Sequence, residues 1–299
     1  MKRTVRGSRA DTLDAARLRA WPLPGAAQGG DKEQRGRVLV VGGRRDLVGA
    51  VRLAGEAALR AGAGKLQLAV ASGAAAALAV AVPEARVLAL PESRGGEVGG
   101  GGGLPALAAR TDALVLGPGL VAGPPLRALA ARLLPRLQGI AVLDAGAIDL
   151  ALLRRWARLP ERPAAVITPH HGEMAALLGC GSDAVAAHAR SIAADCARAW
   201  RVVVVLKHAE TWIADPAGGL WRHRGSPPGL GTGGSGDVLA GLIGGLCARG
   251  ATPAQAACWG VWLHARAAAR LPAGGAAGFL AREIAAGVPA LMAGMHRRA

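Results

Sequence analysis

The sequence contains few aromatic residues and no long apolar segment, and both absences narrow the possible functions. Phenylalanine, tryptophan and tyrosine together make up 3% of the 299 residues. Proteins that bind single-stranded nucleic acid usually combine basic residues with stacking aromatic side chains, whereas the arginines here are spread along the chain. The longest weakly polar run, Ala69–Val82, is too short to cross a bilayer. We therefore expect neither a nucleic-acid partner nor a membrane.

The chain also lacks the features of a secreted or metal-bound protein. Its four cysteines, Cys180, Cys196, Cys247 and Cys258, form no Cys-x-x-Cys pair, so we expect buried free thiols in a reducing compartment. The basic segment 1–9 has no apolar core of a signal peptide. These features predict a soluble cytoplasmic protein without a protein-built metal site.

Two common nucleotide-binding motifs are missing. Val41-Gly42-Gly43 follows a predicted strand but has neither GxGxxG spacing nor the downstream acidic residue of a dinucleotide site, and no GxxxxGK[ST] segment occurs. The formal net charge of +16 nevertheless favours an anionic partner such as a nucleotide or a phosphate.

The order of apolar runs and helical spacings predicts the fold class. Val38–Val41 is a β-branched and leucine run of the kind that is buried in a parallel sheet. Further strands are expected at Leu66–Val70, Arg86–Leu90, Ala113–Leu116, Ile140–Leu143, Ala165–Ile167, Val202–Leu206, Thr211–Ala214 and Gly219–Arg222. Helices are expected at Leu47–Ala61, Leu126–Leu137, Ile148–Ala157, Met174–Leu178, Val238–Ala248, Pro253–Arg270 and Ala281–Met292. The alternation indicates a doubly wound, mainly parallel α/β sheet with helices on both faces, forming one domain over residues 37–299 after a basic, partly ordered segment 1–36.

A glycine-rich segment carries the strongest chemical signal. Residues 231–236 hold four glycines in six positions and run into a predicted helix. Glycines allow backbone N–H groups to converge on an anion, and the start of a helix favours negative charge. Asp237 follows at once, where a phosphoryl-transfer site needs a base for the attacking hydroxyl. A glycine-rich turn with an acidic helix start explains the segment equally well when it is considered alone.

Polar residues follow several predicted strands, where open α/β sheets bind their ligands. Asp144 ends a buried strand and either is hydrogen-bonded structurally or faces a site. Lys207 either contacts a nucleotide or is a solvated lysine in a hairpin. His170 is a candidate for substrate contact, while Glu173 is better explained as a helix-start residue than as a metal ligand.

In this order, the motifs resemble those of the ADP/ATP-dependent NAD(P)H-hydrate dehydratases of the ribokinase-like superfamily. The resemblance runs from about residue 31 and rests on the following segments: Gly36–Gly43, Gly49-Ala50, Ala57–Gly64, Pro83-Glu84, Gly117-Pro118-Gly119, Leu143-Asp144-Ala145, Thr168–Glu173, Val205-Leu206-Lys207 and Thr232–Gly241.

The resemblance implies a repair reaction in which ADP or ATP phosphorylates the hydroxyl of hydrated NADH or NADPH (the S epimer) and phosphate is then eliminated. It implies Asp237 as the catalytic base and Mg²⁺ on the nucleotide phosphates, and it implies a homo-oligomer. The implied contacts to the hydrated coenzyme are Ala50, Gly119, His170 and Asp237. Those to the nucleotide are Lys207, His208, Ala209, Glu210, Thr211, Gly233, Gly234, Ser235 and Gly236.

Several positions depart from the family pattern, and two alternative functions follow. Arg44, Gly146, His171, His208 and Pro227 stand where the family has other residues. A vitamin-precursor kinase of the same superfamily would use the same turn and release a phosphorylated product, whereas a catalytically silent protein would only bind the nucleotide. The sequence leaves open the choice of ADP or ATP and of NADH or NADPH hydrate.

Overall fold

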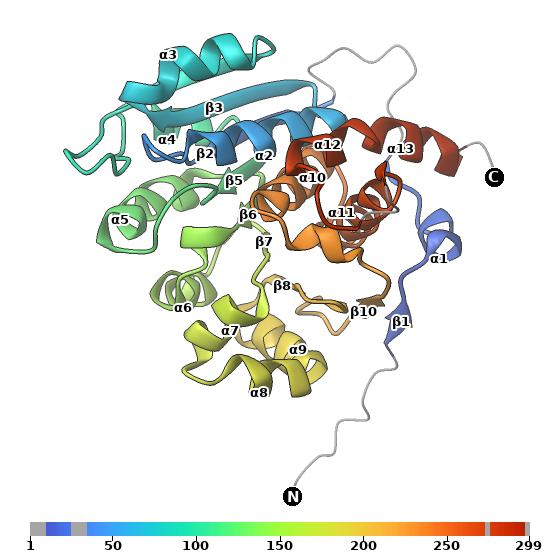
Figure 1. Ribbon diagram of the computed structural model, residues 1–299. Coiled ribbons are helices and arrows are strands. Elements are labelled where there is room, and N and C mark those ends of the chain that lie inside the picture. Colours follow the sequence, from blue (N-terminus) through green and yellow to red (C-terminus); the bar gives the residue numbers. More distant parts are fainter. Residues whose placement is uncertain (1–9, 25–34, 273–275, 297–299) are drawn as a thin grey trace, which may run out of the picture.

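A ten-stranded sheet organises the chain in the computed structural model, which describes residues 10–24, 35–272 and 276–296 (Figure 1). The strand order is β1-β10-β9-β8-β7-β6-β5-β2-β3-β4, and every pairing is parallel except the two made by β9. The strands are β1 (Asp11–Thr12), β2 (Arg37–Val41), β3 (Lys65–Ala71), β4 (Ala85–Leu90), β5 (Ala113–Leu116), β6 (Ile140–Leu143), β7 (Ala165–Ile167), β8 (Val203–Leu206), β9 (Thr211–Ala214) and β10 (Leu220–His223).

Alternate residues of the central strands serve two separate cores. In β2, Val38 and Val40 pack into one core, while Leu39 and Val41 pack into the other. Successive side chains of a strand point to opposite faces, so a strand that is buried on both faces needs an unbroken apolar run. The prediction of a doubly wound, mainly parallel sheet covered on both faces is confirmed.

Helices cover both faces of this sheet. The first core is closed by helices that include α2 (Val48–Arg60), α10 (Ser235–Ala248), α11 (Pro253–Ala268), α12 (Ala281–Ala286) and α13 (Val288–His296), and α1 (Ala15–Arg19) and α3 (Ser72–Ala81) add buried leucines to it. The second core is closed by α4 (Leu104–Ala108), α5 (Pro124–Leu133), α6 (Leu150–Arg158), α7 (His171–Leu178), α8 (Ser182–Ala187) and α9 (Ala189–Trp200). Three short 3₁₀ turns, η1 (Leu134–Arg136), η2 (Ala145–Ala147) and η3 (Pro228–Gly231), complete the elements.

Close packing of α10 on α2 places the glycine-rich turn. A Cβ atom at Gly241 would lie 2.0 Å from the carbonyl oxygen of Ala54, and one at Gly245 would lie 2.4 Å from that of Ala58. The two glycines are one helical turn apart, so they form a groove that receives the backbone of α2. This contact holds the start of α10 beside the carboxyl ends of the central strands.

The predicted strands lie where the sequence analysis places them, whereas several other elements were missed. The structure adds α3, α4, α8 and α9, and it adds β1 and α1 within the predicted N-terminal segment. In that segment Leu18 is fully buried, and the carbonyl oxygen of Trp21 accepts a hydrogen bond from Trp259 Nε1 at 2.9 Å. Residues 1–9 and 25–34 of the segment lie outside the described residues.

The cysteine prediction needs one correction. All four thiols are free, but Cys180 is exposed because it follows the end of α7 at the surface, and only Cys196, Cys247 and Cys258 are buried. Burial raises the pKa of Cys196 to about 11, so this thiol stays protonated at neutral pH. Among the described residues, no helix is long and apolar enough to cross a membrane.

Candidate active site

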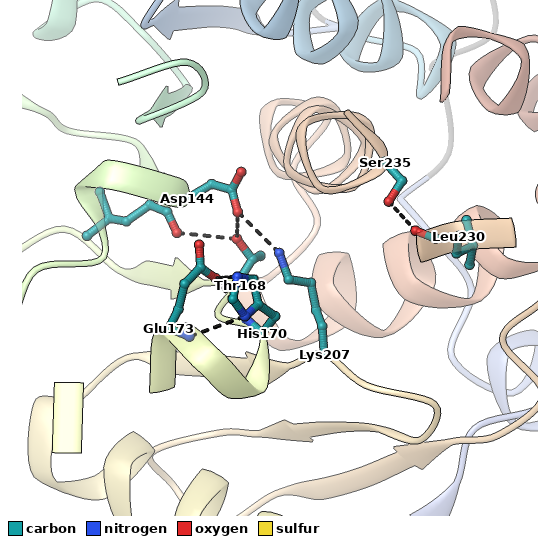
Figure 2. Close-up of polar contacts among 8 residues, drawn as sticks. Asp144, Thr168, His170, Glu173, Lys207, Leu230 and Ser235 are labelled. Atoms are coloured by element: carbon teal, nitrogen blue, oxygen red, sulfur yellow. Dashed lines mark hydrogen bonds and ion pairs between the residues drawn. The ribbon is translucent and has the colours of Figure 1, made fainter. Parts of the chain in front are cut away.

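The carboxyl ends of β6, β7 and β8 bring three polar side chains together. Asp144 is 3% exposed, and its Oδ1 accepts a 2.5 Å hydrogen bond from the hydroxyl of Thr168. Lys207 Nζ lies 3.5 Å from the same oxygen (Figure 2). Asp144 therefore has the structural hydrogen bond and also faces the site, which combines both predicted alternatives. Lys207 is not a fully solvated hairpin residue, because 21% of its side chain is exposed.

The glycine-rich turn lies next to this group. Gly234 takes a left-handed conformation, with φ of 89°, and precedes the first residue of α10. The Ser235 hydroxyl donates a 2.6 Å hydrogen bond to the carbonyl oxygen of Leu230, which ties the helix start back to η3 (Figure 2). A Cβ atom at Gly236 would lie 3.3 Å from Lys207 Nζ. The lysine ammonium and the first turn of α10 thus converge on one place, with glycine leaving room there for an anion.

Asp237 is the titratable group of this turn. Its pKa is raised to about 7, first by burial and then by the negative charge of Asp144, while Lys207 acts in the opposite direction. A general base works best when its pKa is near the working pH. A carboxylate that exchanges a proton near pH 7, beside a place for an anion, meets that requirement.

A cavity of about 760 Å³ opens on the Lys207 side of the turn. Its wall combines strand ends, the glycine-rich turn and four histidines, and this volume suits a small organic ligand. The lining residues are His170, His171, Gly172, Ser182, Lys207, His208, Ala209, Thr211, Ser226, Pro227, Pro228, Leu230, Gly231, Thr232, Ser235, Gly236, Leu239, Val261 and His264.

His170 has a structural part as well as a place in the cavity wall. Its Nδ1 accepts a hydrogen bond from the backbone N–H of Glu173, and the Glu173 carboxylate accepts one from the N–H of His170. The reciprocal pair caps the start of α7, which confirms the interpretation of Glu173 as a helix-start residue. More than half of the His170 side chain stays exposed, at 59%, and the residue lines the cavity.

The other predicted site residues divide into two groups. His208, Ala209 and Thr211 line the cavity with Lys207, Ser235 and Gly236, whereas Glu210 pairs with Arg224 at 2.5 Å outside the lining. Gly233, Gly234, Asp237, Ala50 and Gly119 also lie outside that lining.

Ala50 and Gly119 lie close to each other. A Cβ atom at Gly119 would be 3.2 Å from Ala50 Cβ, and one at Gly234 would be 2.5 Å from Leu53, which is on the same helix as Ala50. The turn therefore contacts different parts of the protein at its two ends. Gly236 lies next to Lys207 and the cavity, and Gly234 lies next to helix α2. Asp237, whose Oδ2 would lie 3.9 Å from that Gly234 Cβ, belongs to the same turn.

Sequence reasoning missed two residues of the site. Thr168 was quoted only as part of a motif, yet its hydroxyl holds Asp144. His264 lies in the apolar helix α11, and its Nε2 is buried, with no hydrogen-bond partner among the described residues. Burial, assisted by the charge of Lys207, lowers the pKa of His264 to about 4, so it is neutral at pH 7. No local motif marks a histidine that reaches the cavity from a distant helix.

Within residues 10–24, 35–272 and 276–296, no group of three or more histidine, cysteine or acidic side chains could hold a metal ion. Lys207 and the first turn of α10 leave a place for an anion, and Asp237 is a carboxyl group that can exchange a proton near pH 7.

Known proteins with the same architecture define the class of this fold and site. A ribokinase-like superfamily protein of Enterococcus faecalis superposes with a TM-score of 0.81 at 24% identity, over 99% of both chains. The ADP/ATP-dependent NAD(P)H-hydrate dehydratase of Bacillus subtilis, co-crystallised with ATP and Mg²⁺, superposes with a TM-score of 0.82 at 26% identity, over 96% of this chain and 99% of that one. The protein is thus an α/β protein of the ribokinase-like fold.

Sequence relatives define the class more narrowly. The family model described as NAD(P)H-hydrate dehydratase matches residues 38–290. The ADP-dependent (S)-NAD(P)H-hydrate dehydratase of Xanthomonas campestris is 51% identical over 288 residues, which cover 96% of this chain and 97% of the relative. The chain belongs to the NAD(P)H-hydrate dehydratase family and is an enzyme of that family.

Proposed function

We propose that this enzyme restores hydrated NADH or NADPH of the S configuration to the reduced coenzyme, with ADP as the phosphoryl donor. The observation that carries the proposal is Asp237, whose carboxyl group has a pKa of about 7 and stands in the first turn of α10 beside Lys207 and the cavity. The relative from Xanthomonas campestris is named as ADP-dependent, which favours ADP over ATP.

The first step is a phosphoryl transfer. Asp237 takes the proton of the hydroxyl group on the hydrated nicotinamide ring, and the hydroxyl oxygen attacks the terminal phosphorus of the donor. The bond from that phosphorus to its bridging oxygen breaks, which leaves AMP when ADP is the donor. Lys207 and the N–H groups of the turn offset the negative charge that the transferring group carries.

The second step is an elimination. The carbon–oxygen bond breaks, phosphate leaves with the electron pair, and a neighbouring ring carbon loses a proton, so the ring double bond is restored. Phosphorylation is useful because hydroxide is a poor leaving group and phosphate is a good one. The sum is hydrated NAD(P)H and ADP converted to NAD(P)H, AMP and phosphate.

The two ligands would occupy opposite sides of the turn. The nucleotide would fill the cavity, contacting Lys207, His208, Ala209, Thr211, Ser235 and Gly236, with Gly233 and Gly234 contributing to the anion site and Glu210 at the edge of the nucleotide site. The hydrated coenzyme would approach from the side of Ala50 and Gly119, with His170 at the rim and Asp237 between the two ligands. Gly119, with φ of 67°, lets this loop approach the start of α2 closely, since a Cβ atom there would lie 2.5 Å from the carbonyl oxygen of Leu47.

Mg²⁺ would arrive on the nucleotide rather than on the protein. No group of three or more histidine, cysteine or acidic side chains among the described residues could hold the ion, and Mg²⁺ at such sites usually takes substrate phosphates together with one or two carboxylates. When bound, it would neutralise charge on the phosphates.

Three further properties are proposals of the same kind. We infer that residues 37–299 act as one domain, that the enzyme assembles as a homo-oligomer and that it works in the cytoplasm without a nucleic-acid partner. Light scattering of the purified protein tests the homo-oligomer. A single domain predicts a single cooperative unfolding transition.

A direct assay tests the reaction. The purified enzyme is incubated with hydrated NADH and ADP, and the absorbance of reduced nicotinamide and the release of phosphate are followed together. Equal amounts of restored coenzyme, AMP and phosphate support the proposal. A stable phosphorylated product without restored coenzyme would indicate a kinase, and no turnover by folded, nucleotide-binding protein would indicate a silent binding protein.

A further inference from the structure

Two histidines that depart from the family pattern lie against each other in the cavity wall. The ring of His171, in the first turn of α7, stacks on the ring of His208, which follows β8. Their centroids are 4.1 Å apart and their planes are within 3° of parallel. The two histidines are far apart in the sequence, but their rings stack because each follows one of the neighbouring strands β7 and β8.

His171 is the buried member of the pair and has unused hydrogen-bonding capacity. The residue is 5% exposed, and neither Nδ1 nor Nε2 has a hydrogen-bond partner among the described residues. Buried polar atoms nearly always have a partner, and leaving one without a partner is destabilising. His171 is among the residues that line the cavity, so a ligand bound there is the natural source of the missing partners.

The chemistry of the ring indicates which part of a ligand it would contact. Burial, and then the nearby His208 and His170, lower the pKa of His171, so the ring is neutral at pH 7. A neutral imidazole offers one donor and one acceptor, which matches hydroxyl and heterocyclic groups better than a phosphate. The positive charge for phosphate is supplied elsewhere in the cavity, by Lys207 beside Gly236.

We propose that His171 is a nucleoside contact of the donor site, whose ring edge exchanges hydrogen bonds with the ribose or base of the bound nucleotide. His208 is a positioning residue that fixes the plane of the His171 ring. The inference rests on the proposed function only in taking the cavity as the nucleotide site, and it does not depend on the reaction that follows.

Calorimetric titration of the whole enzyme with adenosine and with ADP tests this contact. His171→Phe keeps a flat ring but removes both nitrogens, so we expect both affinities to fall by the same factor, about tenfold, as for the loss of one or two hydrogen bonds. His171→Asn and His171→Gln each restore one nitrogen position with an amide, and at least one should recover most of the loss. Lys207→Met is the contrasting variant, since it should lower the affinity for ADP and leave the affinity for adenosine unchanged.

A second measurement observes adenosine binding in the wild-type enzyme and uses a variant only to assign the signals. The NMR signals of the His171 ring are assigned in ¹⁵N-histidine-labelled protein as those that disappear in His171→Asn. Addition of adenosine to the wild-type enzyme should shift these signals. His208→Gly should raise the pKa of His171 and lower the affinity for adenosine. His208→Phe, which keeps a flat ring in the stack, should recover the affinity.

The outcomes separate this inference from the proposed reaction. Unchanged adenosine affinity in folded His171→Phe, or unmoved His171 signals, overturns the contact even if the enzyme restores the coenzyme. Loss of affinity for ADP but not for adenosine assigns His171 to the phosphates and also overturns it. Parallel loss for both ligands supports the contact even if no dehydration is found, and a wild-type enzyme that binds neither ligand overturns both proposals.

Discussion

Lys207 Nζ and Asp144 Oδ1 lie 3.5 Å apart, and Lys207 lines the cavity beside the turn that carries Asp237. The two charges act on the pKa of Asp237 in opposite directions, Asp144 raising it and Lys207 lowering it. The pair therefore adjusts the proton affinity of the proposed base as well as the charge of the anion site.

The first prediction concerns the pH dependence of the reaction. Asp237 must be ionised to accept a proton, so kcat/KM should fall as the pH drops below about 7, the pKa of its carboxyl group. Asp144→Asn removes the negative charge that raises this pKa. The acid limb of the profile, where kcat/KM falls with falling pH, should therefore move to lower pH. Asp195→Asn, at an exposed carboxylate, is the control and should leave the limb in place. A limb that does not respond to Asp144→Asn would contradict this account.

The second prediction concerns Lys207. Lys207→Met removes the cation beside Gly236 and should weaken ADP binding tenfold or more. The same change should move the acid limb of kcat/KM to higher pH, because Lys207 lowers the pKa of Asp237. Titration calorimetry and pH profiles measure the two effects, and Arg154→Met serves as the surface-charge control. An acid limb that stayed in place in Lys207→Met would show that Lys207 does not act on the base.

The third prediction concerns the packing that places the turn. Gly241→Ala would put a Cβ atom 2.0 Å from the carbonyl oxygen of Ala54, so we expect a loss of about 1–3 kcal/mol in unfolding free energy. Gly49→Ala is the matched control in a helix, since nothing lies within 4 Å of its Cβ position, and the higher helix propensity of alanine should stabilise it by up to about 1 kcal/mol. Chemical denaturation measures both. Equal effects of the two changes would mean that the glycine contact does not constrain α10.

The fourth prediction concerns His264 and stability at acid pH. The pKa of His264 is about 4 in the folded chain, whereas an unperturbed histidine has a pKa of 6.5. As the pH falls, the ring therefore takes up a proton in the unfolded chain before it does so in the folded chain. The stability that the neutral ring contributes above pH 6.5 is therefore lost as the pH falls toward 4. The difference in unfolding free energy between wild type and His264→Gln should change across this window. A difference that stays constant across this window for His264→Gln would refute the burial argument.

Much of this site was open to sequence reasoning because its parts are local. The glycines of the turn, Asp237 and the residues that follow strands β6, β7 and β8 are each marked by a short motif, and the sheet brings strand ends together. Asp144 could not be resolved between a structural role and a site role, because only the fold shows that one oxygen meets both Thr168 and Lys207.

What the sequence could not show depends on packing between distant elements. His264 reaches the cavity from α11, and the stack of His171 on His208 exists only because β7 and β8 are adjacent. The N-terminal strand β1 is too short to have a periodic pattern and is defined by its pairing with β10. Gly146, one of the departures from the family pattern, is explained by proximity, since a Cβ atom there would lie 2.4 Å from the carbonyl oxygen of Leu120.

The most direct test of the central claim is the activity of Asp237→Asn. The amide cannot accept the hydroxyl proton, so restoration of reduced coenzyme and release of phosphate should both fall at least about a hundredfold. The affinity for ADP should stay within a few-fold. The variant should also be more stable than wild type at pH 8, on the order of 1–3 kcal/mol, because the folded chain no longer holds a buried carboxylate whose pKa is raised to about 7. An Asp237→Asn enzyme that kept its activity within tenfold of wild type would show that Asp237 is not the base and would contradict the account.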